Sequence, residues 1–440
     1  GFGNLSKIKI DPKDQKDLQL NLVRSHASGV GNPLEPGLIR IIFVLKLLTY
    51  VKGYSGIRPA VAEKIVQFLN NDILPVIPEK GSVGASGDLA PLGHMALALI
   101  GEGKVFYNGK EITTKTALSK VNIKPLVLQQ KEGLSLINGT QVSTALAIKS
   151  LLDGDLLLKT ADIAGALSVE NSFASRKVFQ KKIHALKKHP GQQSAARNVY
   201  KLLNGSKIVK SHSNCGIVQD PYSFRCIPHI HGASRDGFTR AANMIDNEIN
   251  SVSDNPIVLE NGDIVNSGHF HGEHVAQAMD FLAISFCELG AVSERRTHYF
   301  MKGVEGKFNL FVTKSPGVES GYMMAHVTAS ALVSENKTLA HPASVDSLPT
   351  SGGQEDLVSM APWAGQKLLQ IQHNLRHILA VELLVAGAAN QIASPNLTPG
   401  KGTFPILNIL KSLCKYQNGD RTLSGEIESI AKKIKSGEFV

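Results

Sequence analysis

The chain has 440 residues, of which 42% are hydrophobic and 19% are charged, a composition typical of a globular protein with a large buried core. The formal net charge of +10 would suit a nucleic-acid partner, but the basic residues are scattered and only 6% of residues are aromatic, so no stacking surface for bases is indicated. No apolar run reaches the roughly 18 residues of a membrane span, and the four cysteines form no Cys-x-x-Cys pair that would indicate a disulfide framework or a zinc site. We therefore expect a cytoplasmic protein with no membrane or nucleic-acid partner and no metal.

The first part of the chain, to about residue 200, is rich in loops. Residues 103–112, "GKVFYNGKEI", predict a β-hairpin whose turn is Asn108-Gly109. The densest basic stretch, residues 176–190, carries apolar residues among its charges. It predicts a solvated helix face that ends before Pro190, and a phosphate-binding face is the alternative.

Helical periodicity dominates from about residue 201 to residue 440. Apolar residues recur at spacings of three and four in three long runs, residues 274–296, 321–341 and 366–392, and in the last run only Glu382 interrupts the apolar face. Irregular polar segments separate these runs, and such loops on a rigid scaffold often carry function. The sequence thus predicts a mainly α fold with a central bundle of long helices and small irregular or β-hairpin segments in its N-terminal part.

A segment of very small residues, "KGSVGASGDLAPLG" at residues 80–93, directly precedes an apolar helix-like run. A phosphate-binding Walker loop would need Gly-Lys-Ser or Gly-Lys-Thr here. A hydrolase nucleophile elbow would need glycine in place of Asp88. A helix cap, with Ser86 or Asp88 capping a helix that begins near Leu89, explains the acid but not the Ala-Ser-Gly triplet before it.

Covalent chemistry explains the triplet better. In a tight turn, the amide nitrogen of Gly87 can reach the carbonyl carbon of Ala85, and loss of water then closes a five-membered ring. Loss of a second water from Ser86 leaves an exocyclic methylene. Gly87 has no Cβ to block the attack, and the serine supplies the β-hydroxyl that is eliminated. The product, 4-methylidene-imidazol-5-one, is a strong electrophile of a kind that no ordinary side chain provides.

Several segments, in this order along the chain, resemble the aromatic amino-acid ammonia-lyase family, in which the Ala-Ser-Gly triplet matures into this cofactor without another enzyme. They are GFG (1–3), the glycine-rich segment (80–103), EGLSLINGTQ (132–141), VQDPYSFRC (218–226), SERR (293–296) and SENKTLAHPASVDSLPTSGGQED (334–356). The set spans nearly the whole chain, so the resemblance does not depend on a single tripeptide.

The resemblance implies one ammonia-lyase unit over residues 1–440, with a loop-rich cofactor-forming part at about 1–200 and a long-helix part at about 201–440. It also implies a homotetramer whose active sites combine loops from several subunits, and a small amino-acid substrate that loses ammonia across Cα and Cβ. The family's catalytic tyrosine lies just upstream of the Gly-Phe-Gly at which this chain begins. We therefore expect an N-terminally truncated unit, and a truncated non-catalytic homologue is one alternative.

Four polar residues match positions with family roles. Asn138 resembles the asparagine beside the cofactor; a turn residue before Gly139, or a chance glycosylation sequon, is the alternative. Gln219, Tyr222 and Arg225 share one loop, in which the resemblance assigns Gln219 and Arg225 to substrate binding, with Arg225 as the carboxylate clamp, and Tyr222 to proton transfer. Without the resemblance, Tyr222 would be read as packing beside a proline and Arg225 as a surface ion pair.

Two positions bear on the choice of substrate. Ser25-His26 occupies the place of the family's ring-selectivity pair and resembles the histidine-specific branch. Glu355 can hydrogen-bond an imidazole, whereas against a phenyl ring a buried carboxylate would be unpaired and costly. Both favour conversion of L-histidine to trans-urocanate, with Glu355 as a catalytic residue; a phenylalanine or tyrosine ammonia-lyase or an aminomutase is the alternative. A satisfied helix histidine and a helix N-terminal acid are the structural alternatives for the two residues.

The segment HFHGEH, residues 269–274, contains three histidines and a glutamate. Its spacing is not the His-Glu-x-x-His pattern of a zinc protease, so we predict no metal there. The resemblance instead makes Phe270 a wall of the active site.

Overall fold

The computed structural model describes residues 3–212, 218–414, 416 and 419–440. The Gly-Phe of the opening motif and Cys215 lie outside the described residues. The chain divides into two compact units, each assembled from several segments. The first unit comprises Gly1–Lys149, Ala242–Asp280 and Pro342–Gln366, and the second unit comprises Ser150–Ala241, Phe281–His341 and Lys367–Val440.

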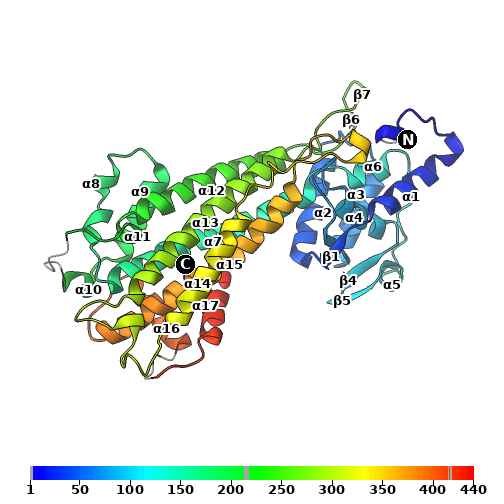
Figure 1. The fold of residues 1–440 in the computed structure, drawn as a ribbon. Coiled ribbons are helices and arrows are strands. Elements are labelled where there is room, and N and C mark those ends of the chain that lie inside the picture. The colour runs from blue at the N-terminus through cyan, green and yellow to red at the C-terminus, as the bar shows by residue number, and fades with distance from the viewer. Residues whose placement is uncertain (1–2, 213–217, 415, 417–418) are drawn as a thin grey trace. The chain divides into compact units, whose positions relative to one another are not determined.

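The first unit holds short helices and small antiparallel sheets (Figure 1). Its helices are α1 (Gln15–His26), α2 (Pro36–Tyr50), α3 (Pro59–Asn70), α4 (Leu89–Leu99), α5 (Thr114–Lys120) and α6 (Glu132–Ile137). Its strands form three small sheets. In the first, β1 (Val30–Pro33) pairs with β3 (Pro78–Lys80), and in the second the strand order is β2 (Leu74–Pro75), β4 (Lys104–Tyr107), β5 (Lys110–Thr113). In the third, β6 (Ile257–Val258) pairs with β7 (Ile264–Val265). The predicted hairpin is confirmed, because β4 and β5 pair with Tyr107 opposite Lys110 around the Asn108-Gly109 turn.

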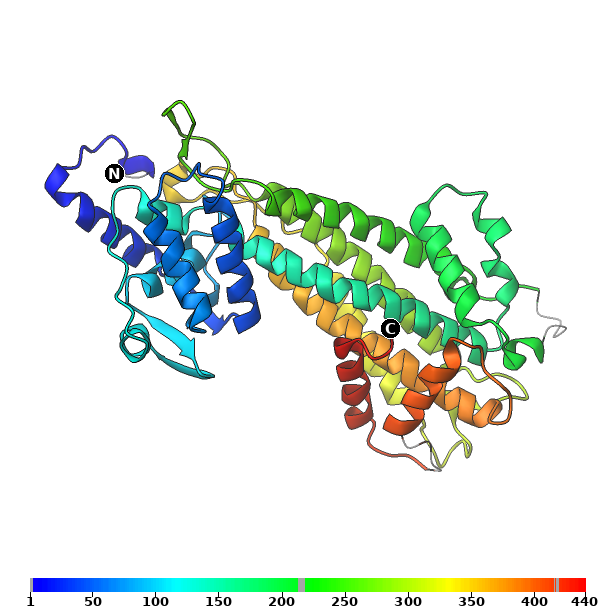
Figure 2. The ribbon, with the colours of Figure 1, turned by 180° about the vertical axis from the view of Figure 1, so that it is seen from behind.

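Long helices running side by side make up most of the second unit (Figures 1 and 2). They are α7 (Gln141–Asn171), α12 (Ile227–Ile249), α13 (Glu273–Met301), α14 (Met323–Leu339) and α15 (Ala361–Ala393); all but α14 begin or end in the first unit. Shorter helices are α8 (Lys181–His184), α9 (Pro190–Leu202), α10 (Lys207–Lys210), α11 (Tyr222–Arg225), α16 (Thr403–Leu413) and α17 (Ser424–Ser436). The mainly α fold with long bundled helices is thereby confirmed.

The three predicted long helices are present as α13, α14 and α15. The apolar face of α15 is fully buried, as its spacing requires, from Leu368 through Ile371 and Leu375 to Val385. Glu382, the one polar residue of that face, is also fully buried and accepts hydrogen bonds from Arg296 of α13, at 2.5 Å from Nε and 2.9 Å from Nη2. The interruption in the pattern is therefore a buried ion pair.

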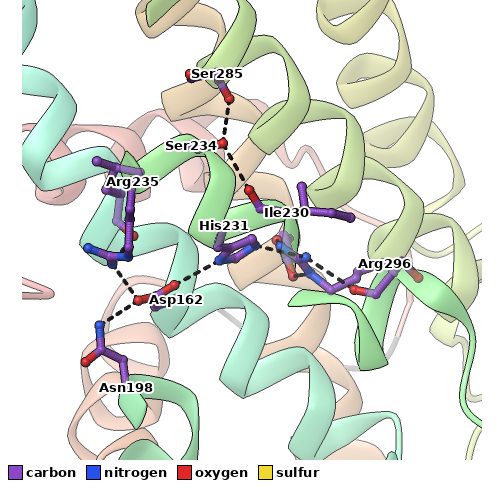
Figure 3. Close-up of polar contacts among 11 residues, drawn as sticks. Asp162, Asn198, Ile230, His231, Ser234, Arg235, Ser285 and Arg296 are labelled. Carbon is purple, nitrogen blue, oxygen red and sulfur yellow. Dashed lines mark hydrogen bonds and ion pairs between the residues drawn. The ribbon is translucent and has the colours of Figure 1, made fainter. Parts of the chain in front are cut away.

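A polar network extends from that ion pair (Figure 3). His231 on α12 lies with Nε2 3.4 Å from Arg296 Nη1 and with Nδ1 2.9 Å from the carboxylate of Asp162 on α7. Asp162 also accepts hydrogen bonds from Arg235 at 2.5 Å and from Asn198 at 2.8 Å. These contacts link α7, α9, α12, α13 and α15, so each buried charge has a partner in the core.

Two predictions about the second unit are wrong. Residues 176–190 do not form one helix, because a 3-10 turn at Arg176–Phe179 and the short α8 bury Phe179 and His184, and α9 begins at Pro190. The segment expected to be a loop with Gln219, Tyr222 and Arg225 is helical from Tyr222 onward, as α11 and then α12. Pro228, His229, His231 and Gly232 hide this in the sequence. Pro228 is still compatible with a helix, because it stands at the second position of α12, where its missing N–H has no helical partner to lose.

The long helix α13 has the length and hydropathy of a membrane span, but 67% of its most apolar window is buried inside the structure. A core helix of a large helical protein has the same composition.

Candidate active site

The Ala85-Ser86-Gly87 triplet forms a sharp turn in the first unit. Ser86 has φ of 50° and Gly87 has φ of 78°, so two successive residues are left-handed, and a serine seldom takes this conformation. Gly87 pairs with Gly139 in a parallel bridge, and a Cβ on Gly87 would collide with the backbone of Gly139. Only glycine fits this position, which gives the turn the tight geometry that ring closure needs.

The turn is tied to its surroundings by backbone hydrogen bonds. The amide of Met360 donates to the carbonyl of Val83 at 2.8 Å, and the amide of Asp88 donates to the carbonyl of Gly139 at 2.8 Å. The amide of Gly139 in turn points to the carbonyl of Ser86 at 3.5 Å. Segments distant in sequence therefore hold the triplet from both sides.

The carboxylate of Asp88 caps a helix other than the expected one. It makes no capping bond to α4, which begins at Leu89, and instead accepts from the amides of Val142 and Ser143, both at 2.8 Å, at the start of α7. Asp88 is fully buried, and burial raises its pKa to about 6, against the opposing hydrogen bonds from Ser143. The acid thus fixes the triplet to the N-terminus of a long helix.

Asn138 directly precedes Gly139 and so lies next to the Gly87–Gly139 bridge. It is 2% exposed, which argues against a surface turn or a usable sequon, and its side-chain oxygen has no partner among the described residues. Its backbone carbonyl accepts a hydrogen bond at 2.5 Å from the ammonium of Lys46, a fully buried lysine of α2.

Glu355 is in direct contact with the triplet. The hydroxyl of Ser86 donates to Glu355 Oε1 at 3.2 Å, while the hydroxyls of Thr350 and Ser351 donate to Oε2 at 2.7 and 2.5 Å. The residue stands in an irregular segment after a 3-10 turn at Ser351–Gly353, so the helix N-terminal alternative is wrong.

His26 is the last residue of α1, close to α4. Its Nδ1 donates a hydrogen bond to the carbonyl of Leu22 at 2.8 Å, since a carbonyl only accepts. Gly93 of α4 permits this approach, since a Cβ there would overlap the backbone of His26. The imidazole is thus anchored through Nδ1, as a satisfied helix histidine would be.

Phe270 is half-buried in the irregular segment before α13. A Cβ on the neighbouring Gly272 would meet Ser359 at 3.2 Å and Thr140 at 3.5 Å, so this segment passes close to residues near the triplet and its bridge partner. Among the described residues no group of three or more histidine, cysteine or acidic side chains is arranged to hold a metal ion.

Gln219, Tyr222 and Arg225 lie in the second unit, at and before α11. Gln219 is exposed, and Tyr222 is 71% exposed. The Arg225 guanidinium lies 4.7 Å from the centre of the Tyr222 ring, a cation–π distance, and its buried Nε has no partner among the described residues. The ten expected site residues thus fall into two groups, seven in the first unit and three in the second.

Sequence reasoning missed Lys46, Gly93 and His94 as parts of this neighbourhood. Lys46 is the only charged residue in the apolar run IIFVLKLL, and that isolation was the available signal. His94 accepts a hydrogen bond from the amide of Gly29 at 3.0 Å, and burial lowers its pKa, which favours the neutral ring that such an acceptor needs.

Comparison with known proteins shows the family of the chain. The sequence pattern of the aromatic amino acid lyase family matches residues 1–412. The chain is 43% identical to the histidine ammonia-lyase of Myxococcus xanthus and 46% identical to that of Burkholderia cenocepacia, over 100% of this chain and 87% of each relative.

Solved structures of this family have the same fold as the chain. The chain superimposes on histidine ammonia-lyase from Trypanosoma cruzi with a TM-score of 0.91 at 36% identity, covering 100% of this chain and 84% of that one. It also superimposes on tyrosine aminomutase from Streptomyces globisporus with a TM-score of 0.92 at 35% identity, covering 100% and 87%. The chain belongs to the aromatic amino acid lyase family.

Proposed function

We propose that this protein removes ammonia from L-histidine without oxidation and releases trans-urocanate. The observation that carries the proposal is the contact between the Ser86 turn and the carboxylate of Glu355. A carboxylate beside the reacting centre can accept the N–H of an imidazole, whereas a phenyl ring offers it no hydrogen-bond donor. Full-length relatives named histidine ammonia-lyase, at 43–46% identity, support the same substrate.

The residues around the triplet fit the cofactor 4-methylidene-imidazol-5-one. The left-handed Ser86-Gly87 turn brings small residues together without a Cβ at Gly87, and the buried Asn138 amide has an unpartnered oxygen beside them. When formed from Ala85, Ser86 and Gly87, this group supplies an electrophile that makes the substrate's amine a better leaving group. Asp88 fixes the backbone next to the triplet to the start of α7, and Asn138 lies beside the bridge between Gly87 and Gly139.

The chain's own side chains then divide the remaining work. Glu355 accepts one N–H of the substrate's imidazole and orients the ring, and His26, held through Nδ1, contacts the same ring. Phe270 forms an apolar wall. Arg225 binds the substrate carboxylate through its planar fork, Gln219 assists that binding, and Tyr222 handles a proton.

We further propose a cytoplasmic homotetramer in which the segment of Gln219, Tyr222 and Arg225 completes the active site of a neighbouring subunit. The exposure of Tyr222 and the unpartnered Arg225 Nε support this, because groups poised for a substrate are left unsatisfied in the single chain.

Product analysis with three substrates tests the proposal. The purified protein is incubated separately with L-histidine, L-phenylalanine and L-tyrosine, and the products are identified by mass. We expect urocanate and ammonia from histidine, with turnover of the other two lower by at least about a hundredfold. A dominant rate with tyrosine or phenylalanine would contradict the assignment of His26 and Glu355, and a β-amino acid product would indicate an aminomutase, as the resemblance to tyrosine aminomutase allows.

A further inference from the structure

Lys46 is an ionisable residue that the proposed reaction leaves without a role. Its side chain is fully buried in α2, yet no carboxylate forms an ion pair with it among the described residues. Its ammonium donates to the backbone carbonyl of Asn138 at 2.5 Å and lies 3.4 Å from Gln141 Oε1. Burying an ammonium against neutral acceptors is unfavourable, so a reason beyond stability is needed.

The position of its acceptor gives that reason. The carbonyl of Asn138 and the amide of Gly139 belong to the same peptide group, and they point in opposite directions. Lys46 holds the carbonyl end, and the amide end faces the carbonyl of Ser86 at 3.5 Å. The carbonyl of Ser86 belongs in turn to the peptide group whose nitrogen is that of Gly87. Two peptide groups thus connect the lysine to the nucleophile of ring closure.

We propose that Lys46 is a positioning residue for closure of the Ala85-Ser86-Gly87 ring, acting through the Asn138–Gly139 peptide group. In the step, a bond forms between the Gly87 nitrogen and the Ala85 carbonyl carbon, and the Ala85 oxygen leaves as water with the amide protons of Gly87 and Ser86. A hydrogen bond at the Ser86 carbonyl fixes the Gly87 nitrogen toward Ala85 and makes its N–H more acidic. No oxidant is needed, and the later loss of the Ser86 hydroxyl does not involve the lysine.

The electrostatic surroundings agree with this role. Burial lowers the pKa of Lys46 to about 7, while the carboxylates of Asp254 and Asp88 favour the charged form. Asp254 is already committed, since it pairs with Lys131 at 2.9 Å and accepts from Ser135 at 2.7 Å. The proton on Lys46 is therefore directed to the Asn138 carbonyl and not to an ion pair.

Peptide masses after a short expression pulse test the inference. Trypsin releases residues 81–104, and the mass of this peptide separates the unreacted chain, the ring that has lost one water and the mature group that has lost two. For Lys46→Met we expect maturation slower than in the unaltered protein by roughly ten- to a hundredfold, with the unreacted peptide accumulating. Lys46→Arg, which keeps a cationic donor, should recover part of the rate.

Lys64→Met is the matched control, because it removes another lysine of the same unit whose ammonium donates to a backbone carbonyl, that of Lys124 at 2.7 Å rather than that of Asn138. It should mature at close to the unaltered rate, and circular dichroism checks the folding of each variant. A folded Lys46→Met variant that matures normally, or that accumulates the one-water species, overturns the inference. If neither Lys46 variant folds, the lysine is structural and the inference is equally overturned.

The inference rests on the proposed cofactor, and the two fail in different ways. An unreacted peptide in the unaltered protein would refute the cofactor itself. Normal maturation in both the unaltered protein and Lys46→Met would refute only the role of the lysine.

Discussion

At the scale of single residues, the proposed choice of histidine as substrate depends on Glu355. Replacing it by glutamine keeps the size and the contacts to Thr350 and Ser351 but removes the charge that an imidazole N–H would meet. We expect Glu355→Gln to lower kcat for histidine by roughly 10²- to 10⁴-fold, with the mass of the peptide 81–104 unchanged from that of the unaltered protein. A variant with full activity would show that the carboxylate has no part in turnover.

The buried ammonium of Lys46 predicts a pH-dependent stability. Its pKa in the folded protein is about 7, below the ordinary value of 10.5, and desolvation is the largest cause. Between about pH 7 and pH 10.5 the unfolded chain holds a proton on Lys46 that the folded chain does not hold. The free energy of unfolding should therefore rise with pH across this range, and the contribution of Lys46 should be constant below about pH 7. The slope is about 1.4 kcal/mol per pH unit at most.

Thermal unfolding of the unaltered protein and of Lys46→Met, measured from pH 6 to pH 10 in steps, isolates that contribution. The difference between the two melting temperatures should change above about pH 7 in favour of the unaltered protein, since only that protein gains stability as the buried ammonium loses its proton. A difference that is the same at every pH would show that Lys46 is not responsible.

Much of the residue-level site could be predicted from the sequence, and the reason is chemical. Ala85-Ser86-Gly87 stands out because no packing argument explains it, and the structure adds the left-handed turn and the contact with Glu355. Lys46 and His94 were missed because their roles depend on backbone partners far away in sequence, Asn138 and Gly29. A one-dimensional pattern does not contain those contacts.

At the scale of elements, amphipathic helices were predictable and fully buried ones were not. Runs within α13, α14 and the first half of α15 have one apolar face, so their periodicity is visible; residues 378–390 of α15 are buried on all sides and were found as the continuation of that pattern. By contrast, every residue of α7 from 160 to 171 is buried, and buried Ser168, Glu170 and Asn171 interrupt any apolar stripe. Such a helix gives no contrast between two faces.

The Arg296–Glu382 ion pair joins α13 to α15, and both side chains are fully buried. Glu382 also accepts from the hydroxyls of Ser168 and Ser293, each at 2.6 Å. Removing one partner, as in Glu382→Leu or Arg296→Met, should destabilise the fold by roughly 3–5 kcal/mol, because an unpaired charge is then left in the core.

A double-mutant cycle in chemical denaturation measures this coupling. The double variant should be more stable than the sum of the single losses implies, since neither charge remains unpaired. Additive losses would show that the pair does not act as a unit. Arg295 offers a control, because its side chain is 57% exposed, and Arg295→Met should cost less than about 1 kcal/mol.

At the scale of the whole molecule, the proposed shared site makes a prediction about mixtures. Ser86→Ala removes the hydroxyl whose loss would leave the exocyclic methylene, and Arg225→Ala removes the proposed carboxylate clamp of the other unit. If one subunit supplies α11 to another, co-expression of the two inactive variants should yield tetramers in which some sites are intact. Histidine turnover should then exceed the sum of the separate variants.

A matched mixture controls for other effects. Ser86→Ala and Glu355→Gln both alter the first unit, where the two residues are in contact, so their mixture has no intact site and should stay inactive. If both mixtures are inactive, the sharing of α11 between subunits is contradicted. If both are active, Ser86 and Glu355 are supplied to one site by different subunits.

The central claim is that the small residues 85–87 exist to become an electrophile, and the mass of the peptide 81–104 from the expressed, unaltered protein tests it most directly. We predict a peptide lighter than its sequence by two waters, and a Ser86→Ala peptide that is not. A peptide of full sequence mass would contradict the account, because a chain of this family without its electrophile could not carry out the proposed elimination.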